Sequence, residues 1–231
     1  MDSFYCPELT VTTQTITLPD SEMKHAIQVK RLRTGDTVQL VNGMGISAHA
    51  VITEISRREC LLQIESVHES SPPLAHALTI AISTIRPNRM DYTVEKLCEV
   101  GVKEIQFLHM KNTSIHTFKK SHLQKIAVSA MKQSKQAWLT TLHEPVLLNN
   151  WLTSLSNDST KLIAHTDSSE ENSINIESSS IDLLIGPEGG FSDEEYRFAI
   201  EHRFQPITLG DTILRAETAA VVGAAKVLSL I

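Results

Sequence analysis

Residues that could bind a metal or carry redox chemistry are few in this 231-residue sequence, and their spacing matches no common site. The three cysteines, Cys6, Cys60 and Cys98, form no CxxC pair, and the ten histidines include no HExxH pair. These absences exclude a zinc ribbon, a thioredoxin-like motif and a helical zinc-protease site. We therefore expect no metal ion, and three free thiols in a reducing compartment.

Long apolar runs and leader features are equally scarce. The longest strongly apolar stretch, Ala219 to Ala225, is far too short to cross a bilayer. The first ten residues, MDSFYCPELT, contain neither the basic region nor the apolar core of a secretory signal. With 41% hydrophobic and 21% charged residues, the composition is ordinary for a globular protein. The expected location is therefore the cytoplasm, without membrane contact.

Positive charge is in deficit overall, but the deficit is local. The net charge is -6; residues 1–72 contain six basic and nine acidic residues, residues 73–150 ten and five, and residues 151–231 five and thirteen. No acid lies between Glu104 and Glu144, whereas six lysines do. The net acidity therefore does not exclude a nucleic-acid partner, because phosphates are bound by local clusters of basic residues.

The first seventy or so residues have the pattern of a small β-barrel-like module. Strands are predicted at Thr37–Val41, Ile46–Ile55 and Cys60–Val67, and a helix at Ser21–Lys30 with Asp20 or Ser21 as its cap. Asn42-Gly43-Met44-Gly45, between the first two strands, is a strong hairpin signal. Ser70-Ser71-Pro72-Pro73 then marks a domain boundary.

After residue 75 strands and helices alternate, which is typical of an α/β domain with a largely parallel sheet. Strands are predicted at Leu78–Ser83, Glu104–Met110, Lys161–His165, Asp182–Ile185 and Pro206–Leu209. Helices are predicted at Arg89–Val100, Phe118–Trp138, Ser192–His202 and Glu217–Leu230. The polar segment Asp167–Ser180 is expected to be a solvated loop.

A glycine-rich loop, Gly186-Pro187-Glu188-Gly189-Gly190, joins one of these strands to a helix. Ser192 and Glu195 have the spacing of a capping box, which fixes where the helix begins. Strand ends of open α/β sheets bind ligands, and glycines let a ligand approach the backbone. The loop lacks the spacing of a P-loop and of a GxGxxG dinucleotide site, so it is not a phosphate-binding loop. A ligand held by backbone amides and carbonyls would suit it better. Taken alone, however, the loop is explained equally well as a tight β-to-α turn.

A second segment, Leu209 to Ala225, repeats this arrangement of strand, glycine, irregular loop and helix. Arg215 and Glu217 flank Ala216 directly before the helix, and small residues make one side of that helix narrow enough for close packing. Taken alone, the arginine and glutamate would form a surface ion pair worth under about 1 kcal/mol. Two glycine-bearing loops at neighbouring strand ends favour a shared site instead.

GPEGGFSDEE (186–195) and LGDTILRAETAA (209–220) together resemble the two C-terminal motifs of the RsmE family, ribosomal RNA small subunit methyltransferase E, within the SPOUT methyltransferases. Looser matches are His25–Arg33 with Gly35-Asp36, Asn88–Asp91 with Glu95–Val102, and Ala130–Ser134. Many family members have Glu before the glutamine of the last segment and Arg soon after it, where this chain has Lys132 and Gln136.

The resemblance implies a PUA-like RNA-binding β-barrel at residues 1–71 and a SPOUT α/β methyltransferase domain with a deep trefoil knot at residues 74–231. It also implies S-adenosyl-L-methionine as methyl donor, a homodimer, and methylation of N3 of one uridine in 16S rRNA of the small ribosomal subunit. The implied cofactor-binding residues are His165, Leu184, Ile185, Gly186, Glu188, Gly189, Gly190, Leu209, Gly210, Leu214, Thr218 and Ala219. Thr166 would belong to the same wall, and His165 taken alone would be an ordinary strand-end histidine.

The implied reaction assigns roles to two residues. A sulfonium methyl is already activated, so the enzyme mainly holds donor and acceptor in line. Uracil N3 becomes nucleophilic when its proton leaves, and the negative charge then spreads onto the flanking carbonyl oxygens. Arg215 is the predicted stabiliser of that charge, and Glu217 is either the general base or the group that orients Arg215. We favour orientation, because a carboxylate beside an arginine is a weak base.

Two basic groups predict where RNA binds. Lys125, Lys132 and Gln136 share one arc of the predicted helix Phe118–Trp138, opposite apolar residues. Lys24, Lys30, Arg31 and Arg33 form the second group, in the N-terminal module. The predicted RNA-binding residues are Lys24, Lys30, Arg31, Arg33, Arg89, Lys125, Lys132 and Lys135. Either group alone would be explained as a solvated face, but both together favour RNA.

Two other functions stay open from the sequence. The chain could be another SPOUT RNA methyltransferase, acting on tRNA or on a ribose 2′-O, because motifs do not reveal the target. It could also be a non-catalytic RNA-binding ribosome-assembly factor that keeps the fold, against which the intact glycines, Arg215 and Glu217 speak. A dehydrogenase-like domain is excluded, because the dinucleotide fingerprint is missing.

Overall fold

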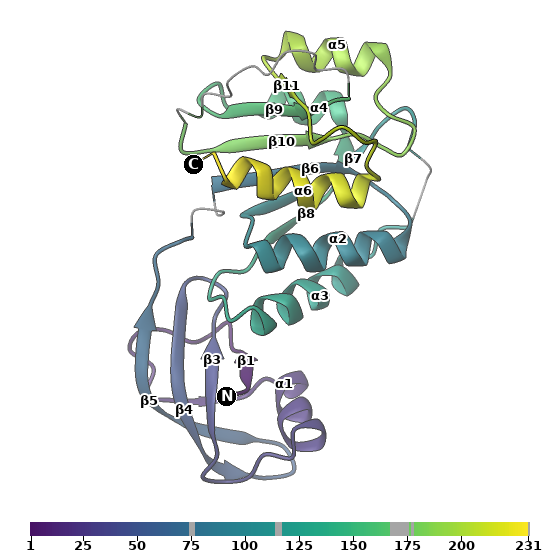
Figure 1. The fold of residues 1–231 in the computed structure, drawn as a ribbon. Helices are drawn as coiled ribbons and strands as arrows, with labels where there is room; N and C mark the ends of the chain where they lie inside the picture. Colours follow the sequence, from purple (N-terminus) through teal and green to yellow (C-terminus); the bar gives the residue numbers. More distant parts are fainter. Residues whose placement is uncertain (74–76, 114–116, 167–175, 177, 231) are drawn as a thin grey trace. The chain divides into compact units, whose positions relative to one another are not determined.

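A computed structural model describes residues 1–73, 77–113, 117–166, 176 and 178–230, in two compact units (Figure 1). The first unit comprises Met1–Pro72 with Val128–Leu139, and the second Pro73–Ala127 with Thr140–Ile231. Hydrogen bonds explain why the later segment joins the first unit: Gly45 N–H donates to Ala137 O, and Trp138 Nε1 donates to Ser70 O. The domain ranges 1–71 and 74–231 stay predictions.

The first unit is built on a curled half-barrel sheet of five strands in the order β1-β3-β4-β5-β2 (Figure 1). The strands are β1 (Ser3–Tyr5), β2 (Thr15–Thr17), β3 (Thr37–Val41), β4 (Ile46–Ile55) and β5 (Cys60–Glu69). β1 is parallel to β3 and the other pairs are antiparallel. Two register irregularities between β4 and β5 help these long strands to bend around a core of apolar side chains.

The predicted hairpin at Asn42–Gly45 is confirmed, and the Asn42 side chain holds it together. Asn42 Oδ1 accepts hydrogen bonds from the N–H groups of Met44 (2.7 Å) and Ile46 (2.9 Å), while Nδ2 donates to Leu9 O (3.1 Å). The asparagine is buried, so these bonds satisfy polar groups that are removed from water.

The predicted helix Ser21–Lys30 is present in altered form. It begins as α1 (Asp20–Lys24) and continues as the π-helical segment η1 (His25–Val29), where Lys30 N–H donates to His25 O at 3.0 Å. The predicted cap is wrong, because Pro19 occupies the N-cap position and no side chain caps the helix. Arg31, with φ +58°, leaves the helical conformation.

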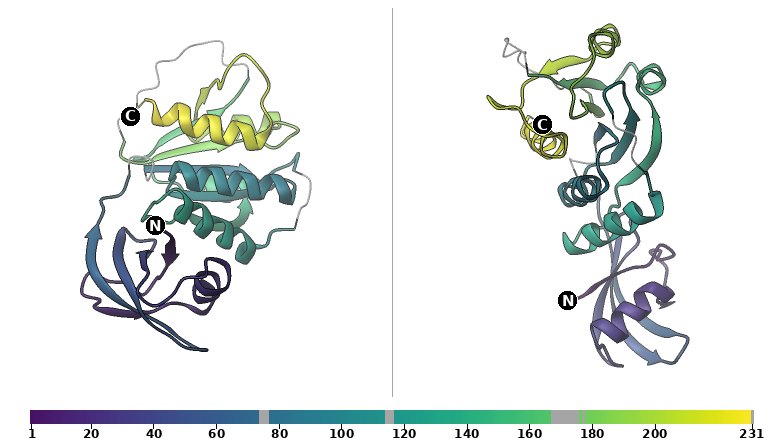
Figure 2. Two further views of the ribbon diagram at one scale, coloured as in Figure 1. Left: turned by 60° about the horizontal axis from the view of Figure 1, so that its bottom comes forward. Right: turned by 90° about the vertical axis from the view of Figure 1, so that its right-hand side faces the viewer.

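The second unit contains a parallel sheet of six strands in the order β11-β9-β10-β6-β7-β8. The strands are β6 (Leu78–Ser83), β7 (Glu104–His109), β8 (Thr141–Leu147), β9 (Thr160–Ala164), β10 (Ile181–Ile185) and β11 (Gln205–Ile207). Every residue of β10 is buried, as expected for a strand covered on both faces. α2 (Pro87–Val100) and α6 (Ala216–Leu228) pack on one face, and α4 (Leu148–Ser154) and α5 (Asp193–Glu201) on the other (Figure 2).

Some helix boundaries lie where short sequence signals predicted them. α5 begins at the predicted capping box, with Ser192 as N-cap and Glu195 as its reciprocal partner. α2 ends at Gly101, whose φ of +86° is the left-handed conformation that favours glycine. Gly223 of α6 leaves no room for a side chain, since an added Cβ would lie 2.8 Å from Leu183 Cδ2.

In this region one predicted helix was too long, two elements were missed, and one predicted loop lies mostly outside the described residues. The long helix is only α3 (Lys120–Gln133), because Lys135 has φ +58°, so Gln136 is not on the helix. β8 and α4 were not predicted; Pro145 within β8 hid an edge strand, where proline is tolerated. The expected loop Asp167–Ser180 lies mostly outside the described residues, and the knot stays a prediction.

Candidate active site

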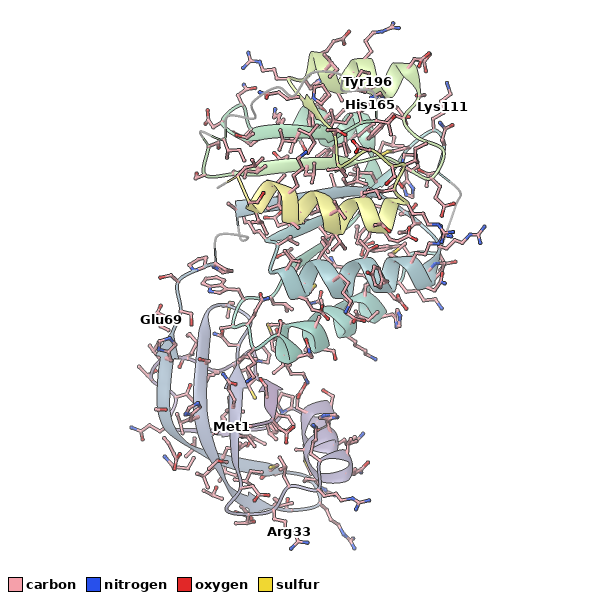
Figure 3. All side chains as sticks on the ribbon, viewed as in Figure 1. Met1, Arg33, Glu69, Lys111, His165 and Tyr196 are labelled. Atoms are coloured by element: carbon pink, nitrogen blue, oxygen red, sulfur yellow. The ribbon has the colours of Figure 1, made fainter. Side chains whose placement is uncertain are left out.

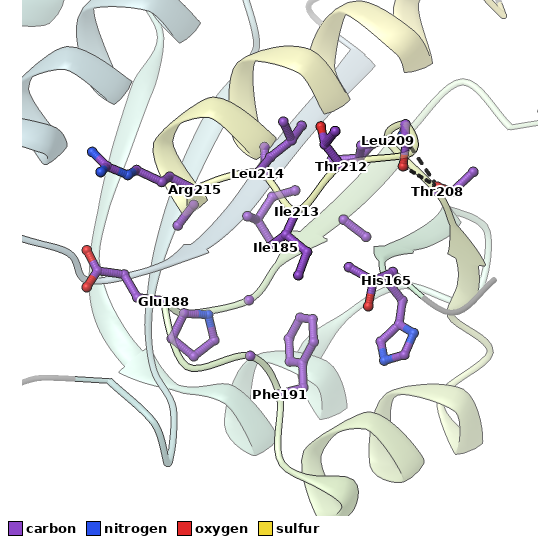
Figure 4. Close-up of a pocket in the computed structure, with 18 of the residues that line it drawn as sticks. His165, Ile185, Glu188, Phe191, Thr208, Leu209, Thr212, Ile213, Leu214 and Arg215 are labelled. Atoms are coloured by element: carbon purple, nitrogen blue, oxygen red, sulfur yellow. Dashed lines mark hydrogen bonds between the residues drawn. The ribbon is translucent and has the colours of Figure 1, made fainter.

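The strand order brings four segments that are distant in sequence to one edge of the sheet. β11, β9, β10 and β6 are neighbours and parallel, so their carboxyl ends meet at that edge. The segments that follow β9, β10 and β11, together with the first turns of α2 and α6, surround a cavity of about 490 Å³ (Figure 4). Carboxyl ends of strands are the usual ligand sites of open α/β sheets.

Nine of the twelve residues proposed for the cofactor line this cavity. They are His165, Ile185, Gly186, Glu188, Gly190, Leu209, Gly210, Leu214 and Ala219. Leu184, Gly189 and Thr218 do not line it: Leu184 is buried in the core under α4 and α5, whereas Thr218 is exposed. The lining also includes Ala164, Thr166, Pro187, Phe191, Thr208, Thr212, Ile213 and Ala216, as well as Arg89 and Arg215.

The glycines of the first loop are required by its shape. An added Cβ at Gly186 would lie 2.9 Å from the Phe191 ring, which lines the same cavity (Figure 4). Gly190 has φ +72°, and its N–H donates to Pro187 O at 2.9 Å to close a tight turn. Side chains at these positions would therefore displace an aromatic wall or strain the turn.

The loop after β7 clamps this turn from outside. Asn112 Nδ2 donates to the carbonyl oxygens of Gly190 (3.1 Å) and Gly189 (3.4 Å). Lys111 N–H donates to Glu195 Oε1 at 2.7 Å, so the residue that caps α5 also holds the neighbouring loop. The sequence contained no signal for Asn112, because its partners are backbone carbonyls 77 and 78 residues away.

Arg89 lies between two carboxylates. Its Nη1 contacts Glu188 Oε1, and its Nε is 3.4 Å from Glu217 Oε1. Glu217 is only 8% exposed, and its other oxygen, Oε2, is buried without a hydrogen-bond partner. A buried carboxylate oxygen without a partner costs free energy, so this arrangement is incomplete in the isolated chain.

Arg215 does not pair with Glu217 in this structure. Its side chain is exposed at the end of the cavity where Glu188 lies, opposite His165 (Figure 4). Among the described residues, no carboxylate forms a salt bridge with it, whereas Glu217 pairs with Arg89. Arg215 is thus available to a substrate group, and the group oriented against Glu217 is Arg89.

His165 has an aromatic neighbour at the other end of the cavity. The centroid of its ring is 4.4 Å from that of the Tyr196 ring (Figure 3), and the backbone N–H of His165 donates to Ile207 O at 3.0 Å. The contact brings the end of β9 against α5 and fixes one wall of the site.

The remaining predicted RNA-binding residues differ in their solvent exposure and in whether they form an ion pair. Lys24, Arg31, Arg33, Lys125 and Lys135 are exposed, and Arg33 is labelled in Figure 3. Lys30 Nζ lies 2.6 Å from Asp2 in an exposed ion pair. Lys132 donates to both oxygens of Glu22, at 2.8 and 2.9 Å, which weighs against a phosphate contact there.

Comparisons with known proteins define the class of protein. The RNA methyltransferase domain family matches residues 72–228, and the RNA methyltransferase PUA domain family matches residues 18–65. The fold and the strand-end cavity are thus those of an RNA methyltransferase with an N-terminal PUA domain, of the SPOUT type.

Relatives that match over most of the chain assign it to a more specific family. The crystal structure of a ribosomal RNA small subunit methyltransferase E from Neisseria gonorrhoeae, bound to S-adenosyl methionine, is 30% identical, has a TM-score of 0.91 and covers 100% of this chain and 98% of its own. A putative methyltransferase from Legionella pneumophila in complex with the same cofactor is 27% identical, with a TM-score of 0.88 and coverages of 98% and 96%. A Buchnera aphidicola ribosomal RNA small subunit methyltransferase E is 28% identical over 89% of this chain and 84% of its own. The chain belongs to the ribosomal RNA small subunit methyltransferase E family.

No described helix is long and apolar enough to cross a membrane. No group of three or more histidine, cysteine or acidic side chains there is placed to hold a metal ion.

Proposed function

We propose that this chain transfers a methyl group from S-adenosyl-L-methionine to N3 of one uridine in 16S rRNA of the small ribosomal subunit. The observation that carries the proposal is the strand-end cavity, with an exposed Arg215 at its rim and a buried, half-satisfied Glu217 beside it. The two solved relatives that contain the same cofactor support it.

The residues of the cavity fit the methyl donor. The cavity of about 490 Å³ is within the range of small-molecule sites. Ile185, Leu209 and Leu214 supply an apolar wall, and the glycines expose backbone amides and carbonyls to polar groups. The net negative charge on the Arg89, Glu188 and Glu217 cluster suits a ligand that carries a positive sulfonium. The bound donor supplies an activated methyl group.

The chain's own residues would do three things. The strand-end loops hold the ligand and exclude water from it, which aligns the reacting groups. Arg215, which forms no salt bridge with a carboxylate of the described residues, would touch the carbonyl oxygens of uracil and stabilise the charge left when N3 loses its proton. Arg89, fixed by Glu188 and Glu217, would position the first turn of α6 and with it Arg215.

Two features support an RNA partner and a second copy of the chain. Exposed lysines and arginines, Lys24, Arg31, Arg33 and Lys135 in the first unit and Lys125 in the second, supply positive charges that can bind phosphates. Ile213, on the loop that lines the cavity, is 88% exposed, and a homodimer would cover such an apolar side chain. We place the protein in the cytoplasm, with ribosomal RNA.

The test is mapping of modified nucleotides in small-subunit rRNA from a strain that lacks this protein. N3-methyluridine should disappear at one position and return when the gene is restored. Full retention of that base would overturn the proposed target. Calorimetry with S-adenosyl-L-methionine separates the alternatives: no binding would favour an assembly factor, and binding with methylation of tRNA or of a ribose would favour another SPOUT activity.

A further inference from the structure

The first unit contains a second cavity, of about 590 Å³, at some of its basic residues. It lies between the helical segment Asp20–Gln28 and the turn that joins β4 to β5. All of its lining residues belong to the first unit, so this hollow is formed without the methyltransferase domain.

Half of the positive charge of residues 1–72 gathers at this hollow. Of the six lysines and arginines in that range, Lys24, Arg57 and Arg58 line it, and Asp20 is the single acid on its wall. All three cations are exposed, and among the described residues none has a carboxylate within salt-bridge distance. In a range with nine acids, three unpaired cations at one hollow form a local site for an anion.

The floor of the hollow is apolar. Met23, Ile27 and Ile55 line it, and all three are only partly buried where they pack on the core of the half-barrel. A cavity with an apolar floor and a cationic rim suits a ligand with a flat apolar face and an attached phosphate. A nucleotide of single-stranded RNA has both.

The backbone around the hollow is held in a defined shape. Ser56 Oγ accepts hydrogen bonds from the N–H groups of Arg58 (3.2 Å) and Glu59 (3.0 Å), and Ser56 N–H donates to Glu59 O. The turn therefore presents both arginines from a fixed frame. On the opposite wall, Ile27 belongs to the π-helical segment, a geometry found often at functional sites.

We propose that this hollow binds one nucleotide of single-stranded RNA, with its phosphate held by Lys24, Arg57 and Arg58 and its base against Met23, Ile27 and Ile55. The inference rests on the proposed function, because it names where the first unit would hold the RNA substrate. It adds Arg57 and Arg58, which the charge pattern of the sequence did not single out.

The test compares two double variants of the full chain with equal loss of charge. Arg57→Gln/Arg58→Gln removes the cations of the turn, and Arg197→Gln/Arg203→Gln removes two exposed arginines of the second unit. Binding of a fluorescein-labelled single-stranded oligouridylate is measured by anisotropy between 0.05 and 0.3 M salt, chosen as roughly the range where the slope is linear. If the contact to the one phosphate at the hollow is lost with the two arginines, the first variant should bind about 5-fold more weakly at 0.1 M salt, with a slope about 0.7 smaller. The control should bind as the wild type does.

Two outcomes would overturn the inference: equal affinity of the first variant and the wild type, or equal losses in both variants. Inorganic polyphosphate serves as a second probe, and it should bind more weakly than RNA with the same number of phosphates, because it has no base for the apolar floor. Equal affinity for the two probes would remove the nucleotide from the proposal. Calorimetry with S-adenosyl-L-methionine should give wild-type affinity in both variants, because the cofactor cavity lies in the second unit, and wild-type midpoints of urea unfolding show that both variants fold. A wild-type chain that binds no cofactor would contradict the proposed function instead.

Discussion

Two buried glutamates, one in each unit, have the same exposed fraction but differ in how completely a cation pairs with their carboxylate oxygens. Glu22 in the first unit and Glu217 in the second are each 8% exposed, and each faces a cation. Lys132 donates to both oxygens of Glu22 at 2.8 and 2.9 Å. Arg89 approaches only one oxygen of Glu217, at 3.4 Å, and the other is buried without a partner.

The difference separates a structural ion pair from a site that needs a ligand. A complete pair offsets the free energy of burying two charges, whereas an unpartnered buried oxygen leaves part of that cost in place. A buried carboxylate oxygen without a partner in a native protein is typical of a site where a ligand or a substrate completes the contact. We therefore expect changes at Glu22 to affect stability and changes at Glu217 to affect catalysis.

The largest expected effect is on turnover. Glu217→Gln should lower kcat by roughly 100-fold, because the position of Arg89 and the first turn of α6 depends on that charge. The free energy of unfolding should not fall, since an incompletely paired buried charge is removed. The matched control is Glu201→Gln, an exposed glutamate of α5, which should change neither quantity.

The pH profile of the same variant distinguishes positioning from proton transfer. A positioning Glu217 leaves the profile of kcat against pH unchanged in shape and lower throughout. Loss of the acidic limb in the variant would instead make Glu217 the general base.

The next largest effect concerns the complete pair. Lys132→Met should lower the free energy of unfolding by about 2–3 kcal/mol, because it leaves Glu22 buried without its cation. Urea unfolding measures the change, and Lys125→Met, an exposed lysine of α3, is the control. Glu22→Gln/Lys132→Met should recover part of the loss in a double-mutant cycle, and additive losses would contradict the pairing.

A thiol beside that pair gives a pH-dependent effect. Burial, together with the nearby Glu22 carboxylate, raises the pKa of Cys6 from 9.0 to about 12. The native state therefore keeps a proton that the unfolded chain releases above pH 9, so this contribution to stability is lost as the pH rises. Between pH 8 and 10 the wild type should lose about 1.4 kcal/mol more than Cys6→Ala in urea unfolding. Equal losses would show that the thiol ionises in the native state.

The smallest expected effect is on the loop that carries Glu188. Asn112→Ala removes two hydrogen bonds to the Gly189–Gly190 turn. S-adenosyl-L-methionine should then bind about fivefold more weakly, because the lost hydrogen bonds are worth roughly 1 kcal/mol. Calorimetry measures the affinity. Asn149→Ala, an exposed residue of α4, is the control, and equal affinity in both variants would show that the turn keeps its shape alone.

Local chemistry explains which parts of the fold could be predicted. The α5 capping box, Gly101 and the Asn42–Gly45 hairpin involve contacts within a few residues, so their sequence signals were sufficient. β8, with Pro145, and the end of α3 at Lys135 depend on neighbours elsewhere in the fold, and the periodicity missed them. The candidate site was found from the composition of its loops, but Asn112 and the partner of Glu217 were not.

The sequence by itself determined the class of fold, the two glycine-bearing loops and the family, because periodicity, turn chemistry and motifs are properties of short segments. Only the tertiary structure decided which charges are free. It paired Lys132 with Glu22 and Arg89 with Glu188 and Glu217, and it left Arg57 and Arg58 at a hollow without a carboxylate partner among the residues that the structure describes. The physical reason is that ion pairing depends on distances of a few ångströms between residues up to 128 positions apart, which no local pattern records.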